Sequence, residues 1–233
     1  MISIHQSQFL SWVPFYYKVL NSDNFIIMDD VQFQKNGVQN RNMIKTPQGA
    51  SWLTVPVKHH LGITINDVNI NNIAVYEKII KTLEINYKKS AFFHEVFSFL
   101  EAIFGKSIEN LNELNNLLFL EILNKLDSKT SISYSSEYQL ASKKDDLVID
   151  LIMRSGDNEY LSGAGAFSYM DLEKFKKNNI KVYTYKFEQI TYTQLWNNRV
   201  GFIKDLSIVD LLFNELNDAK KYITDNGIIT RII

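Results

Sequence analysis

Cysteine is absent from this chain of 233 residues, and proline and glycine are scarce. The lack of cysteine excludes disulfides, thiolate nucleophiles, cysteine-bound thioesters and cysteine-ligated metals. It is also typical of a reducing compartment. The three prolines and nine glycines form no linker and no repeat, so composition marks no domain boundary. We therefore expect one domain spanning residues 1–233.

An excess of charge of one sign is missing too. The 25 basic and 26 acidic side chains nearly cancel, whereas duplex nucleic acid is bound by clustered positive charge. No apolar run reaches the length of about 18 residues that a membrane span needs, and the N-terminal residues lack the basic and apolar regions of a signal peptide. We expect a cytoplasmic protein that has no membrane span and no duplex partner.

Short apolar runs of different periodicity follow one another at the start of the chain. Residues 2–4 and Phe25–Met28 resemble buried strands, and the aromatic residues of 12–20 recur at near-helical spacing. If the two strands are parallel neighbours, the residues behind them emerge at one carboxyl edge, where open α/β sheets bind ligands. These residues are His5, Gln6, Asp29 and Asp30.

The middle of the chain, roughly residues 74–130, has apolar residues at helical spacing and predicts three helices with few groups able to do chemistry. The expected fold class is α/β, with a mainly parallel sheet, flanking helices and this helical middle section. Further strands are expected at 51–57, 63–70, 132–136, 159–162 and 181–187, and helices at 145–154, 170–178 and 207–216, the last capped by Ser207.

A dense group of polar side chains follows the second predicted strand. Such side chains lose rotamer freedom and hydration when they are buried, so the group favours a binding surface over a core. We interpret it as a loop that binds a polar ligand, with the Arg41 guanidinium suited to carboxylate or phosphate. A solvated, amide-rich loop is the alternative. The group consists of Gln32, Gln34, Lys35, Gln39, Asn40, Arg41, Asn42 and Lys45.

Three ionisable residues at the predicted strand ends are candidates for catalysis. His5 could act as a general base or hydrogen-bond a phosphate, or it could simply close its strand. Asp29 and Asp30 are adjacent and point to opposite sides of a strand, so at most one of them faces a site. That one could bind a ligand hydroxyl, an amine or a divalent ion while its neighbour caps a turn. The sequence leaves open which of the two it is.

A glycine pair stands between a predicted strand and a predicted helix. The run Ser162-Gly163-Ala164-Gly165 could wrap an anionic group at a helix N-terminus, although such pairs are also common turns. No set of histidine and acidic residues stands at metal-ligand spacing, so we expect no metal site.

Together these motifs resemble the WbqC-like family over nearly the whole chain. The family carries prolines where this chain has Ser7 and Ser11 and a glycine near Pro14, so the entry loop has a different shape here. The matching segments are His5-Gln6, Trp12, 29–33, 39–42, Ile44-Lys45, 52–57, 160–163, Gly165, Tyr169, Tyr192, Gln194 and 206–214.

Members of that family occur in gene sets for O-antigen and other surface polysaccharides, which implies work on nucleotide-linked sugars. The resemblance implies transfer of an amino acid such as glycine, or of another acyl group, to the amino group of a 4-amino-4,6-dideoxy sugar. It also implies that substrate contacts include Ser162, Gly163, Gly165, Tyr169, Tyr192 and Gln194.

Acylating a sugar amine requires a base, donors for the developing oxyanion and contacts for a diphosphate. We assign the first role to His5 or Asp29 and the second to Gln6 or Asn40. The third role goes to Lys35, Arg41 and Lys45.

The acyl donor, whether free, carrier-bound or tRNA-bound, remains open. Activation by ATP is one route, although the His-x-Gly-His spacing of nucleotidyl-transfer enzymes is absent. Two other functions are open as well. One is a non-catalytic sugar-nucleotide binding protein, and the other is a glycosyltransferase, for which the usual Asp-x-Asp arrangement is missing.

Overall fold

A sheet in the order β10-β9-β8-β1-β2-β7 forms the centre of the fold. The computed structural model describes residues 1–163, 165, 170–188 and 191–233. Within them, neighbouring strands of this sheet are parallel except for β10, which is antiparallel to β9. The strands are β1 (Ile2–Gln6), β2 (Asn24–Met28), β7 (Ser131–Tyr134), β8 (Glu159–Leu161), β9 (Lys181–Phe187) and β10 (Gly227–Arg231).

The strand, helix, strand unit predicted at the start of the chain is confirmed. Helix α1 (Val13–Leu20) connects β1 to β2, which pair in parallel with Ile2 opposite Asn24 and Gln6 opposite Met28. Because this register aligns the two carboxyl ends, the residues that follow both strands meet at one edge of the sheet. The expected α/β class with a mainly parallel sheet is thus confirmed.

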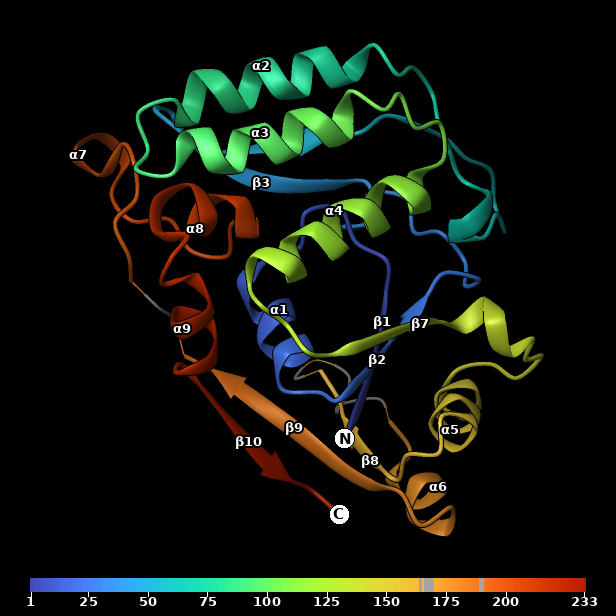
Figure 1. Cartoon of the computed structure of the whole chain (residues 1–233). Helices are drawn as coiled ribbons and strands as arrows, with labels where there is room; N and C mark the ends of the chain where they lie inside the picture. Colours follow the sequence, from blue (N-terminus) through green and yellow to red (C-terminus); the bar gives the residue numbers. More distant parts are fainter. Residues whose placement is uncertain (164, 166–169, 189–190) are drawn as a thin grey trace.

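Helices cover the sheet and extend beyond it. The middle section forms three helices, as expected, and these lie together at one end of the molecule, while α5 and α6 lie at the other (Figure 1). The helices besides α1 are α2 (Val75–Tyr87), α3 (Phe93–Phe104), α4 (Leu111–Lys125), α5 (Asp145–Arg154), α6 (Leu172–Lys177), α7 (Asn197–Val200), α8 (Ile208–Glu215) and α9 (Ala219–Thr224), with 3₁₀ turns η1 (Ile65–Asp67) and η2 (Ser135–Tyr138).

Strand alternation divides the core into two parts. Phe25 and Ile27 of β2 face the larger part, which includes α1, α3, α4 and α8, whereas Ile26 faces a smaller part with α5 and α6. Successive side chains of a strand point to opposite faces, so a short run of apolar residues buries both faces of the sheet. Helix α8 begins as predicted, since the Ser207 hydroxyl accepts a hydrogen bond from the Val209 amide.

The loop predicted for the polar group at 32–45 is partly wrong. Arg41–Thr46 form strand β3, which pairs antiparallel with β4 (Gly49–Thr54). A second small ladder joins β5 (Val57–Lys58) to β6 (Asn69–Ile70). The sequence did not predict this strand because polar and apolar residues do not alternate along it. The strand buries Asn42 and Ile44, one polar and one apolar, while Arg41 and Met43 stay half-exposed.

Strand β10 was not predicted from the sequence. It lies at the edge of the sheet, and its first residue packs against α1. A Cβ atom at Gly227 would lie 2.2 Å from Cζ of the buried Tyr17 ring, so this approach requires glycine. No helix among the described residues has the length and apolar character needed to cross a bilayer.

Candidate functional site

A cavity of about 1600 Å³ lies at the carboxyl edge of the sheet. It is lined by the ends of β1, β2 and β9, by residues that follow β8, and by parts of α1, α5 and the 202–206 segment. This is the edge at which open α/β sheets bind ligands. The polar and charged lining residues include His5, Gln6, Lys18, Gln34, Lys144, Asp145, Lys186, Tyr192 and Asp205.

His5 lies at the end of β1 and lines this cavity, as expected from the sequence. Its ring packs edge-to-face against Phe15, with 5.2 Å between centroids. Nδ1 lies 3.1 Å from the Gln6 carbonyl oxygen, an acceptor, and 3.3 Å from Gln8 Nε2, a donor, so the tautomer decides which of the two hydrogen bonds forms. Burial, reinforced by the nearby charge of Lys18, lowers the pKa of His5 to about 3. At neutral pH His5 is therefore an uncharged hydrogen-bonding group and a weak proton acceptor.

The low pKa of His5 predicts an acid-sensitive fold. Between pH 6.5 and 3, His5 binds a proton in the unfolded chain but not in the folded protein. The free energy of unfolding therefore falls as the pH falls. We expect this group to contribute a loss of about 2–3 kcal/mol between pH 6 and pH 4. Urea unfolding at both pH values measures it.

A matched pair of variants isolates this contribution. His5→Gln keeps a polar side chain without the titration and should lose about 2–3 kcal/mol less than the parent over that interval. His94→Gln changes an exposed histidine and should behave as the parent does. Equal acid losses in His5→Gln and the parent would contradict the prediction.

Gln6 is held in place by a neighbouring glutamine. The Gln39 amide donates to Gln6 Oε1 at 2.9 Å, while Gln39 Oε1 accepts from the Gln34 backbone amide at 2.7 Å. Since the oxygen end of Gln6 is engaged, its Nε2 group is the end that can donate to a ligand. Gln39 itself is buried and supports the site from behind.

The paired acids do not line the cavity. Asp29 is buried, and its carboxylate accepts hydrogen bonds from the Ser135 hydroxyl and from the amide and hydroxyl of Ser136. The Asp30 carboxylate also accepts from Ser135 Oγ. Asp29 thereby satisfies the Ser136 amide at the start of η2, the role that a capping carboxylate fills at a helix N-terminus, while Asp30 contacts the Ser135 hydroxyl.

Most of the predicted polar group also lies away from the cavity. The Asn40 amide donates to the Val55 carbonyl, and the Asn42 amide to those of Phe9 and Leu10. The Arg41 guanidinium lies 4.3 Å from the centroid of the Trp52 ring. Gln32 and Lys35 are exposed. We predicted that this group and His5 surround one cavity. Of the group, only Gln34 lines the cavity, and Gln39 contributes by its hydrogen bond to Gln6.

Lys45 is fully buried in a separate polar cluster. Its ammonium donates to Gln194 Oε1 at 2.8 Å, Asn197 Oδ1 at 2.6 Å and the Gly201 carbonyl at 2.6 Å. The Gln194 amide in turn holds the backbone of Ile203, which lines the cavity. Lys45 and Gln194 therefore shape the segment that borders the cavity, rather than its interior.

Tyr192 connects this cluster to the cavity that it lines. Its hydroxyl donates to Asp210 Oδ2, and Tyr87 donates to Asp210 Oδ1, both at 2.8 Å. Burial raises the pKa of Asp210, although the two hydroxyls and the Lys45 charge oppose this. We name the set Lys45, Tyr87, Tyr192, Gln194 and Asp210, of which only Tyr192 is half-buried, the Asp210 network.

Part of the glycine run after β8 lines the cavity. Gly163 and Gly165 line it, whereas Ser162 is buried and its amide donates to the Tyr183 carbonyl. Tyr169 lies outside the described residues. No group of three or more histidine and acidic side chains among the described residues is arranged to hold a metal ion.

Lys18 lines the cavity but is not among the site residues predicted from the sequence. It belongs to α1, and the other side chains from Phe15 to Val19 are buried aromatic or β-branched residues. A single lysine within such an apolar helix was the available signal, because lysine is almost never fully buried without a reason. The exposed Lys144 and Lys186, at the start of α5 and near the end of β9, were missed as well.

Comparisons with known proteins identify a family and one relative. The model of the WbqC-like protein family matches residues 6–222. An uncharacterized protein of Mycobacterium tuberculosis, Rv1507c, is 34% identical over 226 residues, which cover 95% of this chain and 96% of the relative. No solved structure matches the chain.

Proposed function

This chain belongs to the WbqC-like family, and from that premise we propose that it forms an amide by transferring an aminoacyl or acyl group to the amino group of a nucleotide-linked amino-dideoxy sugar. The observation that carries the proposal is the cavity of about 1600 Å³ at the carboxyl edge of the sheet. Ligand cavities for small molecules span about 300–1,000 Å³, so this one suits a ligand as large as a sugar nucleotide together with a donor.

The lining residues fit the parts of such a reaction. Lys144 and Lys186 supply the positive charge that a diphosphate requires, taking the role first assigned to Lys35, Arg41 and Lys45. The Nε2 amide of Gln6 can donate to the oxyanion that develops on the acyl carbonyl. In the tautomer that donates from Nδ1 to the Gln6 carbonyl, neutral His5 can accept a hydrogen bond from the sugar amine through Nε2 and orient it.

A product assay tests the proposal. The purified protein is incubated with a dTDP-linked 4-amino-4,6-dideoxy sugar and, in parallel, with glycine plus ATP, glycyl-tRNA, a carrier-protein thioester or an acyl-CoA. Mass spectrometry should show the sugar nucleotide heavier by one aminoacyl or acyl group with one of these donors. The matching 4-hydroxy sugar nucleotide serves as the control and should gain no amide.

One outcome separates catalysis from binding alone. If the nucleotide sugar raises the melting temperature while no donor gives a product, the protein is a non-catalytic sugar-nucleotide binder and the transferase proposal fails. Binding without turnover across all four donor classes is therefore the decisive negative result.

A further inference from the structure

Lys18 has an unusual setting for a lysine. Its side chain is 2% exposed, and Nζ donates a hydrogen bond of 2.7 Å to the Ile4 carbonyl of β1. Nζ also lies 6.0 Å from the centroid of the Phe25 ring. Among the described residues, no carboxylate forms an ion pair with this ammonium. The side chain nevertheless lines the large cavity beside His5 and Phe15.

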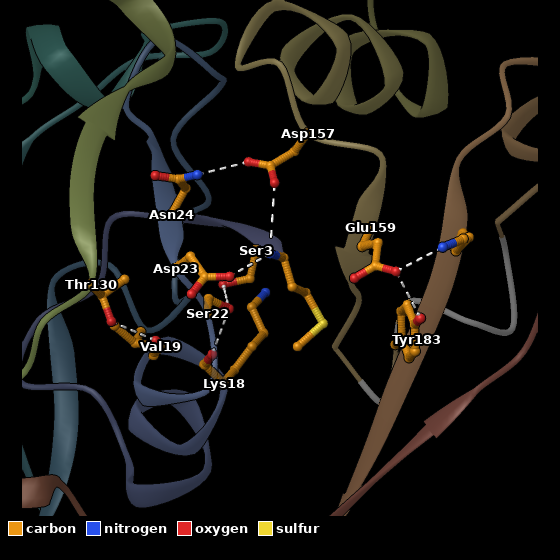
Figure 2. Close-up of polar contacts among 12 residues, drawn as sticks. Ser3, Lys18, Val19, Ser22, Asp23, Asn24, Thr130, Asp157, Glu159 and Tyr183 are labelled. Atoms are coloured by element: carbon orange, nitrogen blue, oxygen red, sulfur yellow. Dashed lines mark hydrogen bonds and ion pairs between the residues drawn. The ribbon is translucent and has the colours of Figure 1, made fainter.

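Hydrogen bonds just beyond the C-terminal end of α1 hold this helix, which carries Lys18, against β1. The Ser22 hydroxyl lies 2.9 Å from the Lys18 backbone carbonyl and 2.8 Å from Ser3 Oγ, which ties the helix to β1 (Figure 2). Ser3 and Ser22 are both buried. These contacts join the end of α1 to β1 and hold the backbone of Lys18 against the sheet.

Burial without a counter-ion disfavours the ammonium form. The pKa of Lys18 falls to about 7 through desolvation alone. The ionisable groups facing α1 from the neighbouring strands titrate far from neutrality: the pKa of His5 on β1 is about 3, and that of Tyr185 on β9 is raised by burial to about 12. The exposed or half-buried charges elsewhere on the cavity lining are Lys144, Asp145, Lys186 and Asp205.

We propose that Lys18 is the proton acceptor of the amide-forming reaction, an inference that rests on the proposed function. The sugar nitrogen attacks the acyl carbon, the C–N bond forms, and the N–H proton passes to the neutral amine of Lys18. The bond between the acyl carbon and its leaving group then breaks, and the leaving group departs with the electron pair. The Lys18 ammonium returns the proton to that leaving group, so atoms and charges balance.

The geometry favours Lys18 over the other candidates. Asp29 is engaged by Ser135 and Ser136 outside the cavity lining. His5 lines the cavity but resists protonation in its buried setting. The Ile4 carbonyl lies where it can stabilise the ammonium that forms on Lys18, and a proton acceptor works best when its pKa is near the working pH.

Steady-state kinetics across pH 5.5–9 test the role with two variants at the same position. Lys18→Met keeps the length without the amine, and Lys18→Arg keeps a cation that gives up no proton. Both should lower kcat by about 10²–10⁴-fold at pH 7.5, with a much smaller change in KM. In the wild type, kcat should fall about tenfold per pH unit below about pH 7, and this limb should be absent from Lys18→Met.

Chemical rescue distinguishes a catalytic amine from a structural one. Methylamine added to Lys18→Ala should restore part of the lost kcat, and more at higher pH, because the free amine replaces the missing proton acceptor. Lys81→Met removes an exposed lysine of α2 outside the cavity lining and should leave kcat unchanged.

The negative outcomes distinguish a failure of the Lys18 role from a failure of the proposed transferase function. A wild-type protein that makes no product with any donor overturns the transferase and, with it, the role of Lys18. An active wild type accompanied by Lys18→Met or Lys18→Arg with kcat within about threefold of it overturns the role alone. An unchanged acid limb in Lys18→Met has the same meaning.

Discussion

Lys45→Met is expected to lower the free energy of unfolding by about 1–3 kcal/mol, the cost of leaving buried polar groups without their hydrogen-bond partner. Lys45 is fully buried, and its ammonium satisfies three oxygens, those of Gln194, Asn197 and Gly201. Methionine fills similar space but donates nothing, so Asn197 Oδ1 and the Gly201 carbonyl lose this donor and Gln194 Oε1 keeps the Ile203 amide. Buried Asp210 also loses a nearby positive charge.

Urea unfolding at pH 7, followed by circular dichroism, measures this loss. Lys35→Met is the matched control, since Lys35 is exposed and lies in the same segment of the chain. It should change stability by no more than about 0.5 kcal/mol. A Lys45→Met variant as stable as this control would show that the Asp210 network contributes no net stability.

Lys18→Met is expected to change stability in the opposite direction, raising the free energy of unfolding by about 2–4 kcal/mol at pH 6. A pKa of about 7 in place of 10.5 means that the folded protein holds the Lys18 ammonium at a cost of roughly 5 kcal/mol. Loss of the hydrogen bond to the Ile4 carbonyl offsets about 1–3 kcal/mol of the gain. The substitution should also raise the pKa of His5, because the Lys18 charge lowers it.

The pH dependence gives this second prediction a distinct signature. The gain is fully present below about pH 7, where folded and unfolded chains both carry the Lys18 ammonium. Above pH 7 the folded wild type releases its proton while the unfolded chain keeps it, so wild-type stability rises and the gain shrinks toward pH 10.5. Urea unfolding at pH 6, 8 and 9.5 measures the trend. A destabilised variant, or a constant difference, would contradict it.

The two buried lysines thus illustrate opposite uses of one side chain. Burial lowers the pKa of Lys45, but its three acceptors and the nearby Asp210 carboxylate offset part of this cost and tie the residue to the segment beside the cavity. Lys18 has one carbonyl and no ion pair within the described residues, so burial is poorly compensated. A buried charge that weakens the fold and lines a cavity is a marker of function, because sites retain groups that stability alone would not favour.

Local pattern was enough to determine the framework of this protein. Runs of apolar residues with periods of two and 3.6 identify β1, α1, β2, the three middle helices, β9 and the Ser207-capped α8. The right-handed strand, helix, strand rule then places His5 and Gln6 at the ligand-binding edge of the sheet. These features depend on residues close together in the chain, and the sequence displays them directly.

Only the tertiary structure decided which polar groups share the cavity. Asp29 meets Ser135 and Ser136, and Lys45 meets Gln194, across more than a hundred residues of chain. Polarity in a sequence states that a side chain needs partners, but not whether a ligand or a distant element provides them. Lys18 shows the converse, because a lysine in a sequence is expected to be exposed to solvent. The packing of α1 against β1 instead removes it from water and lowers its pKa.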